Sequence, residues 1–152
     1  METISEALNN KLNSLLTTLY DGEKGYQEAA DNVNNETLKS RFTTLSKQRY
    51  DFGHEIKEIM TRFGVKPDKG TSTIADIHRF WMSLRTAISN QDEEVILNEC
   101  VRGESSAVET YEDILSDLNL HGEIKQILEN QLVKIRQAKK EMNELKEAFA
   151  IA

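Results

Sequence analysis

The chain has 152 residues, of which 30% are charged, with a net charge of −7, one proline and one cysteine. This length favours a single domain, here residues 1–152, that buries its own core without disulfides or metals. The acidic charge argues against a nucleic-acid partner, because binding to phosphates requires clustered Lys and Arg.

The N-terminus lacks the basic segment and apolar run of a secretory signal. No apolar stretch approaches the roughly 18 residues that a membrane-spanning helix needs. Because Cys100 is the single cysteine, no disulfide forms within the chain. We therefore expect a cytoplasmic protein that has no membrane partner.

The first long segment has the apolar spacing of one helix face. The face comprises Leu8, Leu12, Leu15, Leu19, Tyr26, Ala29 and Val33. The core-facing position between Leu19 and Tyr26 is Gly22. A glycine inside a helix costs about 1 kcal/mol relative to alanine, so Gly22 predicts a bulky group opposite.

A second helix is predicted after Asn34 and Asn35, which can cap it. Its apolar face comprises Leu38, Phe42, Leu45, Phe52, Ile56, Ile59 and Phe63. Arg49 stands at the missing position, and Gly64 with Pro67 ends the helix. The short turn before it makes the first two helices antiparallel neighbours.

Residues 65–71 form the clearest break in periodicity, and Thr73 with Asp76 predicts the next helix start. The apolar face there comprises Ile74, Ile77, Trp81, Leu84 and Ile88. This predicts a helix of about 17 residues, on the order of 25 Å long.

Two further long helices follow. The apolar face of the first comprises Leu97, Cys100, Ala107, Tyr111, Ile114 and Leu118. Glu104 stands at its missing position. The face of the last helix comprises Ile124, Leu128, Gln131, Ile135, Ala138, Met142, Leu145 and Phe149.

Gly22, Arg49 and Glu104 therefore interrupt three apolar faces. If a long crossover joins two antiparallel pairs, the second and third long helices run parallel and place Arg49 and Glu104 in one layer. We predict a buried ion pair, in which the planar guanidinium holds the carboxylate through two nitrogens and Gly22 clears room for it. In the alternative, one charge reaches out to solvent and both are hydrated.

Several short motifs support a family resemblance. They are Asp21–Tyr26 with Ala29-Ala30, Gln48-Arg49, Gly64, His78–Met82 and Glu99–Glu104. Over residues 8–118 the chain resembles the bacterial ferritin-like four-helix bundles of unknown function that neighbour the rubrerythrins. The resemblance implies an all-α, ferritin-like four-helix bundle with an additional helix in the long crossover, and it implies no established activity.

Relatives with a di-iron centre place a Glu on each of two helices and Glu-x-x-His on each of the other two. The nearest match here is Asp51-Phe52-Gly53-His54, whose Asp51 and His54 lie off the core-facing positions. Among the core-facing positions, Glu104 is therefore the carboxylate left to bind a metal, and the cation Arg49 beside it is an unfavourable neighbour for a metal ion. We expect no cofactor; the alternative is iron or manganese, with Glu104, Asp51 and His54 as candidate ligands.

His78 and Trp81 lie on one side of the crossover helix. One interpretation is a small pocket where this helix meets the bundle, with Glu99 as the partner of His78. The other is a packed Trp beside a histidine that a carbonyl or carboxylate satisfies. Cys100 is predicted to be a small buried hydrophobe, not a nucleophile.

The leading hypothesis is a non-enzymatic, structural or stress-associated bundle that acts through protein contacts. A homodimer is expected, because Leu16, Val101 and Ile127 are apolar residues left beside the core faces. The alternative is a ferritin-like di-metal carboxylate protein, either an iron or manganese oxidoreductase or a metal store. A third hypothesis is a small-ligand binder, for which Gly22 and Gly103 leave space.

Overall fold

The computed structural model describes residues 5–65, 67, 75–120 and 122–151, and for residues 75–77 and 151 only the backbone. Its helices are α1 (Glu6–Asn32), α2 (Glu36–Arg62), α3 (Ala75–Ser89), α4 (Glu93–Leu115) and α5 (Gly122–Ile151). Within these ranges there is no β-strand, so the predicted all-α class is confirmed.

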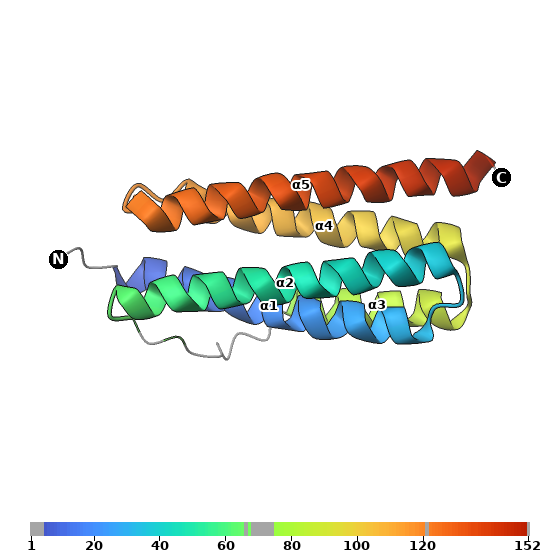
Figure 1. Ribbon diagram of the computed structural model, residues 1–152, viewed down its shortest axis with the longest axis horizontal. Coiled ribbons are helices and arrows are strands. Elements are labelled where there is room, and N and C mark those ends of the chain that lie inside the picture. Colours follow the sequence, from blue (N-terminus) through green and yellow to red (C-terminus); the bar gives the residue numbers. More distant parts are fainter. Residues whose placement is uncertain (1–4, 66, 68–74, 121, 152) are drawn as a thin grey trace.

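The helices form a bundle of two antiparallel pairs, α1 with α2 and α4 with α5 (Figure 1). The connection from α2 to α4 returns the chain to the end of the bundle where α2 began. As a result, α2 and α4 run in the same direction. The intervening helix α3 packs against α1 and α4.

Side-chain caps mark where α1, α2 and α4 begin. The side chains of Ser5, Asn35 and Asp92 accept hydrogen bonds from backbone N–H groups one turn into α1, α2 and α4. Gly64 follows the end of α2 with a φ of 74°, a conformation that favours glycine. The predicted start of the crossover helix at Thr73 lies outside the described residues.

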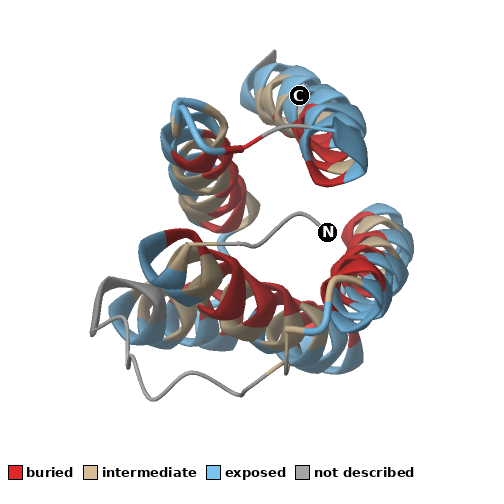
Figure 2. Ribbon diagram, turned by 90° about the vertical axis from the view of Figure 1, so that its left-hand side faces the viewer, coloured by how far each residue is buried: buried red, intermediate tan, exposed pale blue. Residues whose placement is uncertain are grey.

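The buried faces of the helices point toward one another, as the red segments in Figure 2 show. They form two apolar clusters. One contains Leu12, Ile56 and Leu128, and the other contains Phe42, Leu97 and Met142. The layer that contains Arg49 and Glu104 lies between these two clusters along the length of the helices.

Two core assignments from the periodicity are wrong. Leu118 is 99% exposed, because α4 ends at Leu115 and the chain turns there. Leu120 is buried in its place. Leu16, assigned to the margin of the core, is buried within it at 2% exposure.

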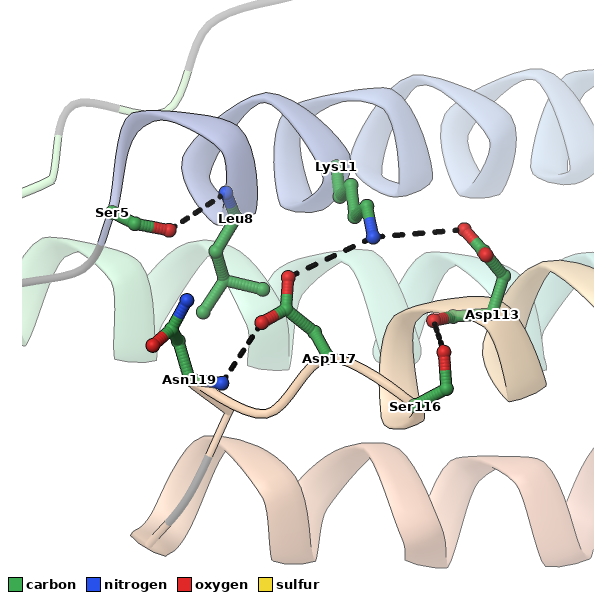
Figure 3. Close-up of polar contacts among 7 residues, drawn as sticks. All are labelled: Ser5, Leu8, Lys11, Asp113, Ser116, Asp117 and Asn119. Atoms are coloured by element: carbon green, nitrogen blue, oxygen red, sulfur yellow. Dashed lines mark hydrogen bonds and ion pairs between the residues drawn. The ribbon is translucent and has the colours of Figure 1, made fainter.

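Polar contacts hold the turn after α4 in place (Figure 3). The Asp117 carboxylate accepts a hydrogen bond from the Asn119 backbone N–H at 2.9 Å, and its other oxygen lies 3.7 Å from Nζ of Lys11. This ties the end of α4 to the first turns of α1, so the turn has a defined position and Leu118 points outward.

None of the helices described is both long enough and apolar enough to span a lipid bilayer.

Candidate functional site

Arg49 and Glu104 meet in the middle of the bundle. Arg49 comes from α2 and Glu104 from α4, and the parallel course of these helices brings the two residues to the same height. Nη2 of Arg49 lies 2.6 Å from Oε1 of Glu104 and also contacts Oε2. The side chains of Arg49 and Glu104 are 5% and 1% exposed, so the charges face each other inside the core.

The contact uses one guanidinium nitrogen for both carboxylate oxygens, instead of the predicted pair of parallel hydrogen bonds. Nε of Arg49 is buried and has no hydrogen-bond partner within the described structure. The guanidinium carbon of Arg49 lies 5.8 Å from the ring centre of Tyr26, within the range of a cation–π contact.

Tyr26 adds a third member, which the sequence interpretation missed. Its hydroxyl donates a hydrogen bond to Oε1 of Glu104, and its ring is buried at 3% exposure. We call Tyr26, Arg49 and Glu104 the ionic triad. The spacing along the sequence could have indicated Tyr26, because it lies one helical turn after Gly22 on the same face of α1.

Gly22 makes room for Arg49, although at a different part of the side chain from the one expected. A Cβ added at Gly22 would lie 3.3 Å from Cγ and 3.8 Å from Cδ of Arg49. The glycine therefore accommodates the aliphatic stem of Arg49, and the guanidinium reaches past it to Glu104.

The electrostatics of the triad favour one protonation state. Burial by itself lowers the pKa of Arg49, but the Glu104 charge, the hydrogen bond to Glu104 and the two nearby tyrosines together more than offset this, so the pKa of Arg49 is raised and the guanidinium stays charged. Burial, and then the Glu104 charge, raise the pKa of Tyr26 well above its ordinary value, so the hydroxyl keeps its proton.

A second buried polar group lies next to the triad along α4. The Tyr111 hydroxyl donates to Oε1 of Gln131 at 2.6 Å. Nε2 of Gln131 donates to Oε1 of Glu55 at 2.8 Å and to the Phe52 carbonyl at 3.3 Å. Gln131, the polar residue on the core face of α5, is thus satisfied by neighbours on α2 and α4.

Two aromatic side chains fix α3 to the bundle. A Cβ added at Gly103 would approach Cε2 of Phe80 to 2.6 Å, and one at Gly25 would approach Cδ2 of Trp81 to 2.5 Å. Both glycines are therefore close-contact sites, and the space predicted at Gly103 is filled by Phe80. The Trp81 ring also meets the Tyr26 ring edge-on, with centroids 5.2 Å apart.

A pocket of about 450 Å³ lies between α1, α3 and α4, and we call it the α3 pocket. The ionic triad lines its buried end. The apolar residues Leu15, Leu19, Phe80, Trp81 and Ala107 line its sides. The exposed residues Arg79 and Arg102 line its rim.

Of the residues predicted for a crossover pocket, Trp81 lines the α3 pocket, whereas His78 and Glu99 do not. His78 is exposed, because it lies about two and a half helical turns before the buried Ala87 on α3 and so faces the opposite side of the helix. Glu99 pairs with Arg102, its neighbour on α4.

The off-core candidates for metal binding face solvent. Asp51 pairs with Lys47 at 3.2 Å, and the His54 ring stacks on Tyr50 with centroids 6.1 Å apart. In the part of the chain that the structure describes, no three His, Cys, Asp or Glu side chains are grouped as a metal site. The Glu104 carboxylate contacts Arg49 and Tyr26, so these residues do not fit an internal di-metal centre.

Cys100 lies one helical turn before Glu104 and is fully buried as a free thiol. Burial raises its pKa well above the ordinary value, and the charges of Glu104 and Glu99 raise it further. A neutral, enclosed thiol fits the predicted small core residue.

A family model described as a domain of unknown function, DUF2383, matches residues 7–117, and the chain belongs to this family. The matched residues cover α1 to α4, including the whole ionic triad and the α3 pocket, and stop before α5. No curated protein matches the chain.

Proposed function

We propose that this member of the DUF2383 family is a non-enzymatic, ferritin-like helical bundle, in which the ionic triad occupies the layer where metal-binding relatives hold their ions. In this proposal the protein has a structural or stress-associated role in the reducing cytoplasm and acts through contacts with other proteins. The observation that carries it is the contact of the Glu104 carboxylate with Arg49 and Tyr26 in a fully buried position.

The ferritin-like assignment is supported by the chain path. Two antiparallel pairs are joined by a long connection that contains a helix, and α2 and α4 run parallel because of it. This is the arrangement in which side chains from facing helices meet at mid-bundle, where di-metal proteins of this fold class place their ligands.

The charge at that layer favours a structural role over metal binding. A metal ion at Glu104 would sit beside the Arg49 guanidinium, which repels it. Displacing the guanidinium would strand a buried positive charge, which typically costs several kcal/mol. A closed ion pair instead specifies which helix faces meet, so the triad sets the register of α1, α2 and α4.

Metal analysis tests the proposal against its alternative, an iron or manganese oxidoreductase or store. Protein purified without a metal-binding tag is incubated with Fe²⁺ or Mn²⁺, passed through a desalting column and analysed for bound metal. We expect far less than one ion per chain. Stoichiometric metal that is lost in Glu104→Gln would support the alternative.

A control separates surface uptake from core binding. Asp51→Asn with His54→Ala removes the two exposed candidate ligands and leaves the triad intact. Metal that disappears in this variant, and persists in Glu104→Gln, would come from the surface of α2.

The proposed partner includes a second copy of the chain. Leu16 cannot contribute to a dimer, because it is 2% exposed. Val101 and Ile127 are half-buried and present the rest of their side chains on α4 and α5. Light scattering across a concentration series should show a dimer, and a strict monomer at high concentration would contradict this part of the proposal.

A further inference from the structure

We propose that the α3 pocket binds a small uncharged molecule whose body is apolar and about the size of one aromatic ring. The pocket volume of about 450 Å³ lies within the range of small-molecule sites, roughly 300–1,000 Å³. This inference goes beyond the proposed function and does not depend on it, because it rests on the pocket and its lining.

The space of the pocket comes from small side chains on α4. Phe80 packs against Gly103, in the close contact described above, and forms one wall. Toward the C-terminal end of α4 the next lining residues are Ser106, Ala107 and Thr110. Their short side chains leave open, one helical turn further along, the kind of space that Phe80 fills at Gly103. The pocket is therefore present in the packed bundle before any ligand arrives.

The charged groups around the pocket are already engaged. Arg49 contacts Glu104, and Arg102 pairs with Glu99. Arg79 also has an interaction partner. An ion that entered the pocket would lose hydration without gaining a free counter-charge, which is costly among apolar groups. The pocket therefore favours an uncharged ligand.

The walls of the pocket favour a hydrocarbon body. They comprise Leu15, Leu19, Phe80, Trp81 and Ala107. Such walls offer water few hydrogen bonds, so an apolar group that displaces water from them gains free energy. The rings of Phe80 and Trp81 meet edge to face with centroids 4.7 Å apart, and they give a ligand ring an aromatic surface to pack on.

Trp81 reports on binding, because it is the only tryptophan of the chain and lines the pocket. Its fluorescence is followed at neutral pH while 2-phenylethanol, phenylacetate or 2-phenylethylamine is added to the full chain. These probes share a phenyl ring and carry no charge, a negative charge and a positive charge, respectively. We expect a saturable change with the alcohol, and affinities at least about tenfold lower for both ions.

Matched leucine substitutions locate the site. Ala107→Leu places a larger side chain in the pocket and should weaken binding of 2-phenylethanol by about tenfold or more. Ser106→Leu narrows the pocket at an exposed position, where the fold is not disturbed, and should also weaken binding. Ala148→Leu is the control: it lies exposed on α5, outside the pocket lining, and should leave binding unchanged.

A second measurement separates binding in the pocket from a solvent effect of the alcohol on Trp81. A ligand that binds only the folded chain stabilises it. The urea midpoint should therefore rise with 2-phenylethanol in the parent and in Ala148→Leu, and it should rise less in Ala107→Leu and Ser106→Leu.

Three results would overturn the inference. An affinity for either ion that equals or exceeds that for the alcohol would refute the charge argument. Equal effects of Ser106→Leu and Ala148→Leu would refute the location. Absence of a saturable change with 2-phenylethanol would refute the pocket as a site for this class of ligand. None of these results bears on metal content, so the ferritin-like proposal is tested separately.

Discussion

Glu104 and Arg49 are each stable in the core only because the other is present. Glu104→Gln removes the negative charge and leaves the Arg49 guanidinium buried without a counter-charge. We expect the free energy of unfolding to fall by about 3–5 kcal/mol. Urea denaturation followed by circular dichroism measures this loss.

Glu112→Gln is the matched control on the same helix. Glu112 pairs with Arg136 at 3.5 Å, but both side chains are 54% exposed. An exposed pair contributes about 0–1 kcal/mol, so this variant should change stability little. A loss below about 0.5 kcal/mol for Glu104→Gln, the size of a surface effect, would show that the triad is not the structural element inferred here.

Buried hydroxyls in and beside the triad make the fold sensitive to alkali. The pKa of Tyr26 is raised by burial and by Glu104, and that of Tyr111 is raised mainly by burial. In the unfolded chain both lose their protons near pH 10, roughly the ordinary value for tyrosine. Above that pH the unfolded state binds fewer protons than the folded state, so stability falls as pH rises.

The expected slope is about 1.4 kcal/mol per pH unit for each buried tyrosine, beginning above roughly pH 10. Urea unfolding between neutral pH and pH 11 checks it. Tyr26→Phe costs about 1.5–3 kcal/mol at neutral pH by removing a hydrogen bond to a carboxylate. The stability gap between this variant and the parent should narrow above pH 10, and a constant gap would contradict the buried state of the hydroxyl.

Single residues of the site were only partly readable from sequence. Gly22, Arg49 and Glu104 were detectable because each breaks an apolar repeat. Tyr26 was not detected, because a tyrosine satisfies the repeat while its hydroxyl forms a polar contact. The unpartnered Nε of Arg49 depends on the angle of approach to Glu104, which spacing along a helix does not specify.

At the scale of elements, α3 is held by two close contacts between a ring and a glycine. Gly103→Ala and Gly25→Ala would drive a methyl group into Phe80 and Trp81, respectively. Overpacking typically costs about 1–3 kcal/mol. We expect both variants to be less stable in urea than the parent, although alanine is the better helix former by about 1 kcal/mol.

Gly22→Ala provides the comparison. Its Cβ would lie 3.3 Å from Cγ of Arg49, a less severe approach than those at Gly25 and Gly103, so the loss should be smaller than at either of these glycines. Phe80→Leu combined with Gly103→Ala should recover part of the stability lost by Gly103→Ala. Strictly additive losses would mean that Phe80 and Gly103 do not contact each other as the structure has them.

Helix existence was predictable, whereas helix ends were less so. The periodic apolar faces and the Asn35 cap predicted the long helices correctly. The apolar repeat predicted that Leu118, beyond the end of α4, is a core residue. This was wrong because a periodic pattern carries no information about the turn at residues 116–119. How α3 docks depends on ring shape against glycine, and periodicity does not describe shape.

At the scale of the whole molecule, the ionic triad divides the core into two apolar clusters. Cys100 belongs to the cluster on the α3 side and contacts no solvent. Its thiol is therefore a probe of any opening that exposes the core face of α4. In the folded chain a thiol reagent can reach it only through unfolding of the region around α4.

We expect Cys100 to react with such a reagent at a rate set by the population of the open state. If Glu104→Gln costs about 3–5 kcal/mol, the open population and the labelling rate rise by roughly a hundredfold or more. Labelling of folded protein with Ellman's reagent, compared with the urea-derived stability of each variant, tests this. Ser40→Cys with Cys100→Ala supplies an exposed thiol on α2 as the reference for full accessibility. Rapid labelling of Cys100 in the parent, or a rate unaffected by Glu104→Gln, would mean that α4 opens locally and that the two clusters do not unfold as one unit through the triad.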